Sequence, residues 1–342
     1  IALQYTEDFA DVYSLLGMEY LFIDEVNHAK NSFIKCLEHD SDDQSALSNV
    51  IYCYDFLDEH EDAIQFLEEF IDHNPYSEVA WHQLGRQFFT IKDYKKAIEA
   101  FDFACVIDES FIGAYLEKGR SYEKLKMYTQ AIVCYKETLK IDDPSSYVYR
   151  KIGYCYEGLK KYDSALKYYL KSVHEDPLMD KTWVAIADLH LKKNDFKKAL
   201  QFINKALGID EQNHLYWRRF AIVNKELTFY EEAVLGFKKA IEHGDKFLDT
   251  WLFLSDSHYL LNDVPTAIET LLKATEIFND EYEIEYRLSA LYMLHNETEK
   301  SLYHLVNGMS LNFTNRTIIE ELFPTIWENE IIQKYIQNFN HN

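Results

Sequence analysis

The side chains of this sequence that could act as nucleophiles or metal ligands are five cysteines and 13 histidines. The cysteines include no CxxC pair, and each falls at a helical position where a small apolar residue would pack. The histidines on predicted helix faces have no partners at metal-ligand spacing. We interpret the cysteines as inert core thiols of a reducing compartment, and we expect no metal site. These residues are Cys36, Cys53, Cys105, Cys134 and Cys155, with His28, His60, His82, His190 and His258.

Motifs of catalysis and cofactor binding are absent from the sequence, which contains no GxGxxG, GxxxxGK, HExxH or GxSxG. The adjacent carboxylates Asp42-Asp43 and Glu231-Glu232 come at predicted helix starts, where negative charge favours the helix dipole. Three Asn-x-Thr sequons, at Asn296, Asn312 and Asn315, occur without a secretory signal, and we interpret them as coincidence. We expect a protein that is not an enzyme and that uses no cofactor or small-molecule substrate.

Composition indicates one continuous helical architecture. The 342 residues include only 10 Gly and 5 Pro, and no stretch resembles a linker. Hydrophobic residues make up 47% of the chain but are interrupted too regularly by charge for a membrane span. The formal charge of −23 disfavours nucleic acid as a partner, because a polyanion would be repelled. We expect a soluble, cytoplasmic protein without membrane insertion.

Three residue types recur every 34 residues along the sequence. Alanine occurs eight times at this spacing, and Ser301 continues the series. A large residue stands 16 positions before each alanine, and a small residue stands four positions after that large residue in most repeats. Small residues inside strong helices favour a close approach of two helix axes, with aromatic rings filling the remaining space. The alanines are Ala29, Ala63, Ala97, Ala131, Ala165, Ala199, Ala233 and Ala267; the small residues are Gly17, Gly85, Gly119, Gly153, Ala187, Ala221, Ser255 and Ser289, with Ile51 as the exception.

This pattern resembles the signature of the tetratricopeptide repeat, W-x₂-L-G-x₂-Y followed by A-x₃-F and a terminal Pro. One repeat matches it at Trp81, Leu84, Gly85, Phe88, Ala97, Phe101 and Ala104, and another at Tyr149, Ile152, Gly153, Tyr156, Ala165, Tyr169 and Pro177. The resemblance implies an all-α fold, an α-solenoid that winds antiparallel helix pairs into a right-handed superhelix. Asp-Pro and Asn-Pro steps predict the end of one helix and an acidic cap on the next.

The predicted organisation is nine repeats over residues 10–312, starting near 10, 44, 78, 112, 146, 180, 214, 248 and 282. Residues 1–9 align with the tails of second helices, so we expect a truncated preceding repeat and a natural chain that continues N-terminally. Residues 313–342 are predicted to form C-terminal capping helices. A detachable helix that binds a partner is the alternative for this segment.

The resemblance implies that a partner segment binds in a concave groove lined by the first helix of each repeat. Groove positions between residues 78 and 247 carry ten cations against five carboxylates, a net charge of +5. We therefore expect an acidic or carboxylate-bearing partner, because Arg binds carboxylates in a bidentate manner. The alternative is that these cations pair with neighbouring acids or extend into water. The predicted site is Arg86, Arg120, Lys124, Arg150, Lys151, Tyr154, Lys181, Arg218, Arg219 and Lys225, with Lys192 as the tenth cation; the carboxylates are Glu117, Glu123, Glu157, Asp188 and Glu226.

The predicted function is a non-enzymatic scaffold or adaptor that binds another protein. The carboxylate clamp of chaperone-binding arrays is not complete in any three adjacent repeats, although Asn49, Lys181, Arg86, Arg219 and Arg287 occupy clamp-like places. The alternative function is the regulatory or substrate-targeting part of a longer enzyme or signalling protein. Nucleic-acid binding is a third reading, disfavoured by the charge.

Overall fold

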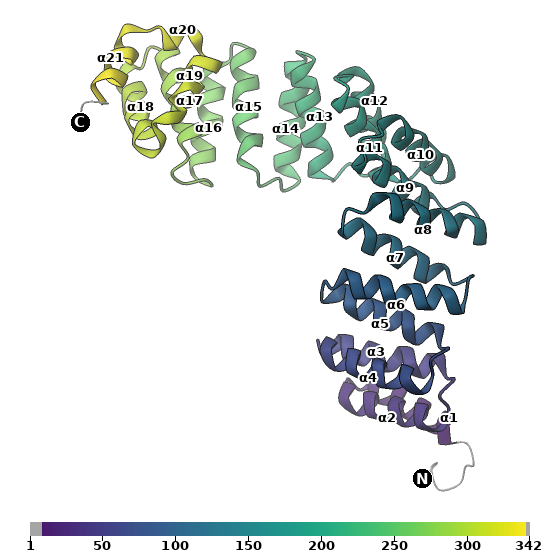
Figure 1. The fold of residues 1–342 in the computed structure, drawn as a ribbon. Coiled ribbons are helices and arrows are strands. Elements are labelled where there is room, and N and C mark those ends of the chain that lie inside the picture. Colours follow the sequence, from purple (N-terminus) through teal and green to yellow (C-terminus); the bar gives the residue numbers. More distant parts are fainter. Residues whose placement is uncertain (1–8, 340–342) are drawn as a thin grey trace. The chain divides into compact units, whose positions relative to one another are not determined.

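The computed structural model describes residues 9–339, and within them the chain is all-α, with helices α1 to α21 and no strand. The expected tail of a preceding repeat lies almost wholly outside the described residues. Most helices form antiparallel pairs, and the pairs follow one another along the chain (Figure 1). The helices cluster into two compact units, which we call unit 1 (Ile1–Asp176) and unit 2 (Pro177–Asn342).

Unit 1 contains five helix pairs in the described residues, and each unit is an α-solenoid. The pairs are α1 (Phe9–Phe22) with α2 (Val26–His39), α3 (Gln44–Phe56) with α4 (His60–His73), α5 (Glu78–Thr90) with α6 (Tyr94–Ile107), α7 (Ile112–Lys124) with α8 (Tyr128–Ile141), and α9 (Ser146–Gly158) with α10 (Tyr162–Glu175).

Unit 2 contains four described pairs and a C-terminal set of short helices. The pairs are α11 (Asp180–Lys192) with α12 (Phe196–Ile209), α13 (His214–Glu226) with α14 (Tyr230–Glu242), α15 (Leu248–Leu260) with α16 (Val264–Thr275), and α17 (Tyr282–Leu294) with α18 (Thr298–Asn312). A 3₁₀ turn (Thr314–Arg316) then leads to α19 (Thr317–Leu322), α20 (Pro324–Trp327) and α21 (Glu330–Phe339).

The C-terminal helices pack onto the last pair of unit 2. Ile319, Phe323, Ile326, Ile332 and Ile336 are buried in the same apolar cluster as residues of α17 and α18. These helices therefore cover the apolar face that the last pair would otherwise expose, as the capping role requires.

In several helix pairs, a glycine of one helix faces an aromatic ring of the other. A methyl group built on Gly85 of α5 would lie 2.6 Å from the ring of Phe101 in α6, and one on Gly153 of α9 would lie 2.5 Å from the ring of Tyr169 in α10. Phe101 and Tyr169 are fully buried. The two helix axes can approach this closely only because the small residue has no side chain in the way.

The turn inside each pair contains one residue in the left-handed region, and this residue also recurs every 34 positions. Its φ lies between 56° and 67° in all nine pairs of residues 9–339. The following amide donates to the carbonyl five residues earlier, for example Asp93 N–H to Phe88 at 2.9 Å, which ends the first helix in a Schellman motif. The series is Asp24, Asp58, Lys92, Lys126, Lys160, Asn194, Thr228, Asn262 and Asn296.

The junctions between pairs end helices as predicted, but the predicted acidic caps are wrong. α4 ends at His73 and α8 at Ile141, before Pro75 and Pro144. Asn74 and Asp142 cap the helices that they follow. The next helix starts two to three residues after the proline, so Ser77 becomes the N-cap of α5 and accepts from the N–H of Ala80 at 3.2 Å. The proline separates the acid from the helix that it was predicted to cap.

We expect Gly85→Ala to lower the free energy of unfolding by about 1 kcal/mol or more, because the added methyl group overlaps the buried ring of Phe101. The matched control is Gly208→Ala in α12, where no atom lies within 4 Å of the added group. That variant should gain up to about 0.5 kcal/mol from helix propensity. Urea unfolding midpoints followed by circular dichroism measure both, and equal shifts in the two variants would contradict the ring–glycine contact.

Candidate partner-binding surface

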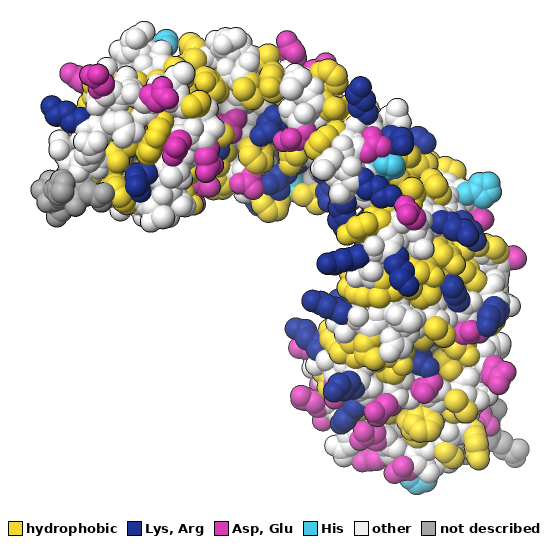
Figure 2. Space-filling view, turned by 45° about the horizontal axis from the view of Figure 1, so that its top comes forward, with side chains coloured by type: hydrophobic (Ala, Val, Ile, Leu, Met, Phe, Trp, Pro, Cys, Tyr) yellow, Lys and Arg dark blue, Asp and Glu magenta, His cyan; other side chains and the backbone are white. Residues whose placement is uncertain are grey.

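The predicted site residues of unit 1 lie on three consecutive first helices, α5, α7 and α9. We call the surface formed by the first helices of the pairs the first-helix face. Figure 2 shows Lys and Arg side chains following one another along one side of unit 1, in the lower part of the view. Of the six residues, Arg86, Lys124 and Tyr154 are exposed, whereas Arg120, Arg150 and Lys151 are partly buried.

Aromatic rings support three of these cations. The guanidinium of Arg120 lies 5.1 Å from the ring centre of Phe89, which comes from the preceding first helix. Arg150 and Lys151 lie 5.4 Å and 5.7 Å from the ring centre of Tyr147. A ring face attracts a cation without neutralising it, so these contacts orient the three side chains and do not by themselves compensate their charge.

Carboxylates compensate some of the cations of unit 1. Arg120 pairs with Glu117 at 2.6 Å and Lys151 with Glu123 at 2.8 Å, while Arg86 is 3.9 Å from Asp55. Burial acts to lower the pKa of Arg120, but Glu117 outweighs this effect and holds that pKa above its ordinary value. Among the described residues, Lys124 and Arg150 have no ion pair.

Contacts join the first helices of unit 1 into one continuous face. Asn49 of α3 donates to the sulfur of Met18 in α1 at 3.9 Å, and Gln87 of α5 donates to Asp55 of α3 at 2.8 Å. The contact of Arg120 with Phe89 joins α7 to α5, and the pair between Lys151 and Glu123 joins α9 to α7. A ligand lying across these helices would therefore meet an uninterrupted surface.

The four predicted residues of unit 2 lie on α11 and α13. Lys181 is exposed and has no ion pair among the described residues. Arg218 pairs with Asp249 at 3.2 Å and lies 4.5 Å from the ring centre of Phe247. The ammonium of Lys225 lies 4.3 Å from the ring centre of Phe253.

Two forked ion pairs of the same geometry join neighbouring first helices of unit 2. Arg219 donates through Nε and Nη2 to the two carboxylate oxygens of Asp188 at 3.1 and 3.3 Å, and Arg287 donates in the same way to Asp256 at 3.0 and 3.2 Å. The first pair is about one-third exposed, with side-chain values of 35% and 33%, whereas the second is buried, at 8% and 11%. Arg219 therefore makes a structural contact, and a ligand of this face would share it with Asp188.

The charge of the face is smaller than the sequence predicted. Asp55 and Asp249 lie outside the range from which the charges were counted, yet each is within pairing distance of a site arginine. With them included, the counted groove positions are five cations and four carboxylates in unit 1, and five cations and three carboxylates in unit 2, so their net charges are +1 and +2. The alternative reading, that many of these cations pair with neighbouring acids, holds for Arg120, Lys151, Arg218 and Arg219.

Sequence reasoning missed a set of apolar residues on the first-helix face of unit 1. The exposed residues of α1 and α3 on this face are large and apolar, and two of them occupy the same repeat position as Arg86 and Arg120. Comparing one repeat position along the whole chain, rather than counting charges from residue 78 onward, would have found them. They are Leu15, Met18, Phe22, Tyr52 and Phe56.

The thiols lie in the helix packing, and the imidazole of His82 lies against the rings of Phe101 and Phe111. All five cysteines are free and buried. Burial raises the pKa of Cys36 and Cys105 to about 12 and that of Cys53 and Cys134 to about 11, which keeps these thiols protonated and unreactive. Burial also lowers the pKa of His82 to about 4. Within residues 9–339, no group of three His, Cys, Asp or Glu residues could hold a metal ion, and no helix is long and apolar enough to cross a membrane.

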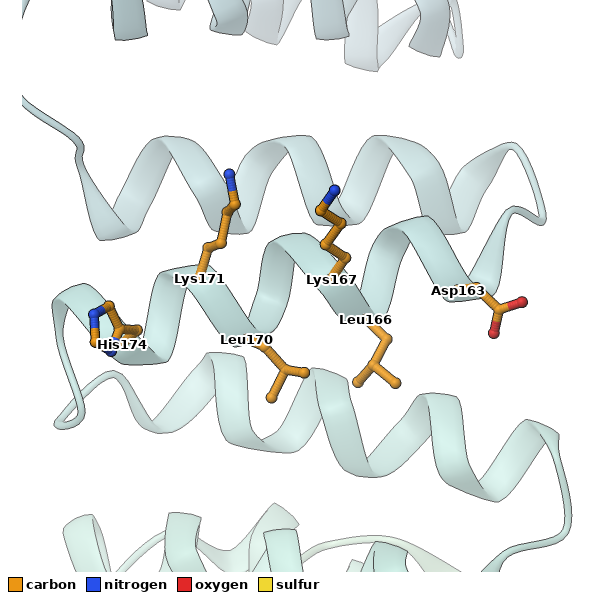
Figure 3. A pocket seen from close by; sticks show the side chains of 6 residues that line it. All are labelled: Asp163, Leu166, Lys167, Leu170, Lys171 and His174. Carbon is orange, nitrogen blue, oxygen red and sulfur yellow. The ribbon is translucent and has the colours of Figure 1, made fainter.

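A shallow hollow of about 510 Å³ lies along α10, the last helix of unit 1 (Figure 3). Lys167 and Lys171 point to one side of the helix, and Leu166 and Leu170 point to the other. Asp163 and His174 lie near its two ends. This mixture of side chains provides no convergent set of groups for a cofactor.

Comparison with known proteins places the fold in a familiar class. The tetratricopeptide repeat family model matches residues 10–43, 112–144, 147–177 and 180–213. The C-terminal part of a TPR repeat-containing protein from Cytophaga hutchinsonii is similar in structure, with a TM-score of 0.62 and 17% identity over 70% of this chain and 98% of that one. Pseudomonas aeruginosa pilF gives a TM-score of 0.50 and 17% identity over 61% of this chain and 95% of that one. Both likenesses concern the fold alone.

A human protein, general transcription factor 3C polypeptide 3, is similar in sequence. It is 25% identical over 107 residues, which are 30% of this chain and 12% of the human protein. The matched part is therefore a small fraction of that relative.

We expect Arg287→Met to lower the free energy of unfolding by about 3–5 kcal/mol, because it leaves the Asp256 carboxylate buried without a partner. The matched variant Arg219→Met removes the equivalent but more exposed pair and should cost about 1 kcal/mol or less. Urea unfolding measures both. Adding Asp256→Leu to Arg287→Met should recover most of the loss, and equal costs for the two single variants would contradict the assigned burial.

Proposed function

We propose that this chain, which carries tetratricopeptide repeats, binds an acidic segment of a partner protein on the first-helix face of unit 1. Repeats of this kind are protein–protein interaction scaffolds, and the finer statement about the partner rests on the charges of that face. Among the described residues, Lys124 and Arg150 lie on neighbouring first helices and have no carboxylate partner. This observation carries the proposal.

Aromatic rings beside the cations of α7 and α9 favour an anionic protein segment over a small anion as the ligand. Arg120, Arg150 and Lys151 lie against Phe89 and Tyr147, whose flat rings provide apolar contact area beside each charge. Exposed Tyr154 packs edge-on against Tyr128 at 6.2 Å between ring centres. Arginine and tyrosine are the side chains that most often dominate the energy of protein interfaces. A peptide with acidic residues along one side would contact both kinds of group.

Unit 2 is the weaker candidate for this role. Arg218 and Arg219 already hold carboxylates of the same face, at 3.2 Å and 3.1 Å, and a ligand carboxylate would have to displace them. Displacing a bonded carboxylate leaves it unpaired, and this cost offsets much of the gain from the new contact. We therefore assign the acidic segment to unit 1.

We expect the double variant Lys124→Glu, Arg150→Glu to weaken binding of the captured partner about tenfold or more, with a smaller loss as salt increases, because the affinity is partly electrostatic. Partners are captured from a lysate of the source cells, identified by mass spectrometry and their affinities then measured with purified protein. The control, Lys95→Glu with Lys167→Glu, makes the same change in net charge on the second helices α6 and α10. Thermal unfolding should be unchanged in both variants. Equal affinities in the two double variants would reject the proposed face.

A further inference from the structure

The first-helix face of unit 1 changes character along the unit. Its first two helices, α1 and α3, present large apolar residues, and the next three, α5, α7 and α9, present the cations described above. The change is visible at a single repeat position, which reads Met18, Tyr52, Arg86, Arg120 and Tyr154. A second position reads Phe22, Phe56, Thr90, Lys124 and Gly158.

The apolar part of this face is exposed in the interior of the unit as well as at its edge. Tyr52 and Phe56 lie on α3, which has helix pairs on both sides, and they are still 53% and 62% exposed. Their rings lie 6.4 Å apart and are tilted by 39°. Exposed apolar residues that cluster in this way mark binding surfaces more often than singly scattered ones do.

A hollow of about 300 Å³ lies among these residues, between α1 and α3. Met18 and Tyr52 form part of its lining together with Phe56, and Asn49 contributes an amide that donates to the sulfur of Met18 at 3.9 Å. A single bulky side chain fits a hollow of this size, and methionine at its wall adapts to different shapes.

We propose that the segment bound by unit 1 has two parts, a bulky apolar residue seated in the hollow between α1 and α3 and acidic residues lying against the cations of α5, α7 and α9. The inference rests on the proposed function, since it concerns the same ligand. Complementary charge selects an acidic protein segment as the occupant. The contacts that join α1 to α9 make the apolar and basic parts one face, so a single extended chain can reach both.

The helix spacing sets the distance between the two parts of the ligand. Packed helices lie about 8–10 Å apart, so Arg86 on α5 is about 12–15 Å from the hollow and Lys124 on α7 about 20–25 Å from it. An extended chain advances about 3.3 Å per residue. The acidic residues should therefore lie about four to seven positions from the apolar anchor.

Selection from a phage-displayed library of random 16-residue peptides on the full chain tests this spacing. Enriched peptides should share an aromatic or large aliphatic residue and at least two acidic residues at the stated separation. Peptides selected on the double variant Tyr52→Gln, Phe56→Gln should still share the acidic residues but no longer share the apolar residue. Selection on Lys124→Glu, Arg150→Glu should retain the anchor and lose the acidic preference.

The control variant is Val106→Gln with Val133→Gln, which removes two apolar residues that are 74% and 55% exposed on the second helices α6 and α8. It should select the same peptides as the wild type. For one enriched peptide, fluorescence anisotropy should show at least a tenfold loss of affinity in each of the two first-helix-face variants and none in the control. Circular dichroism melting curves should be unchanged in all three, because every substituted side chain is exposed or only partly buried.

The outcomes separate the two claims. Peptides enriched in acidic residues with no apolar residue at a fixed separation would overturn the two-part ligand and leave the proposed function standing. An absence of acidic preference, or of any enrichment, would overturn both. Sedimentation of the wild type as a dimer that Tyr52→Gln, Phe56→Gln dissociates would show that a second copy occupies the apolar residues, which also overturns the two-part ligand.

Discussion

The close approach of two helices within each pair is the constraint on which the rest of the structure depends. In α5/α6 and α9/α10 the first helix provides the small residue, and a buried ring of the second helix covers it. In α13/α14 the roles are shared: Ala221 stands at the usual small position, and Gly236 of the second helix provides the missing space, since a methyl group on it would lie 2.9 Å from that of Ala221. The contact thus needs a fixed sum of volumes, and either helix can provide the gap.

This constraint also determines which positions are free to vary. Most buried residues inside the helix pairs are small or apolar, whereas first-helix residues such as Met18, Tyr52 and Arg86 are exposed. The same position is therefore methionine, tyrosine, arginine or aspartate in different repeats without a change of fold, as at residues 18, 52, 86 and 188. In such an array, the residues that determine function are expected at positions that do not take part in packing.

The sequence predicted the helix pairs and the capping helices well, because packing repeats every 34 residues and leaves a visible pattern. It predicted the surface less well. Whether Arg219 faces water or Asp188 depends on the spacing of two helices and on side-chain rotamers, and those are properties of the folded chain.

The left-handed turn residues were missed because they share a conformation and not a residue type, being Asp, Lys, Asn or Thr. The residues at Asp256 and Arg287 repeat those at Asp188 and Arg219 two repeats later, a signal that a search for charges 31 residues apart would have found.

A cation on the first-helix face can be held in place by a carboxylate, by an aromatic ring or, like Arg120, by both, and the presence of a carboxylate decides whether the cation is available to a ligand. A carboxylate partner, as Asp256 is for Arg287, fixes the guanidinium by neutralising it, so the pair contributes to structure and little to recognition. An aromatic partner, as Tyr147 is for Arg150, restricts the side chain through its ring face and leaves the charge uncompensated. A ligand carboxylate that contacts Arg150 therefore displaces no bonded acid. Because the ring already restricts the arginine side chain in the free protein, less conformational entropy is lost when the ligand binds. In the proposed binding mode the rings would also contact the ligand, since each presents apolar area directly beside the charge that it orients.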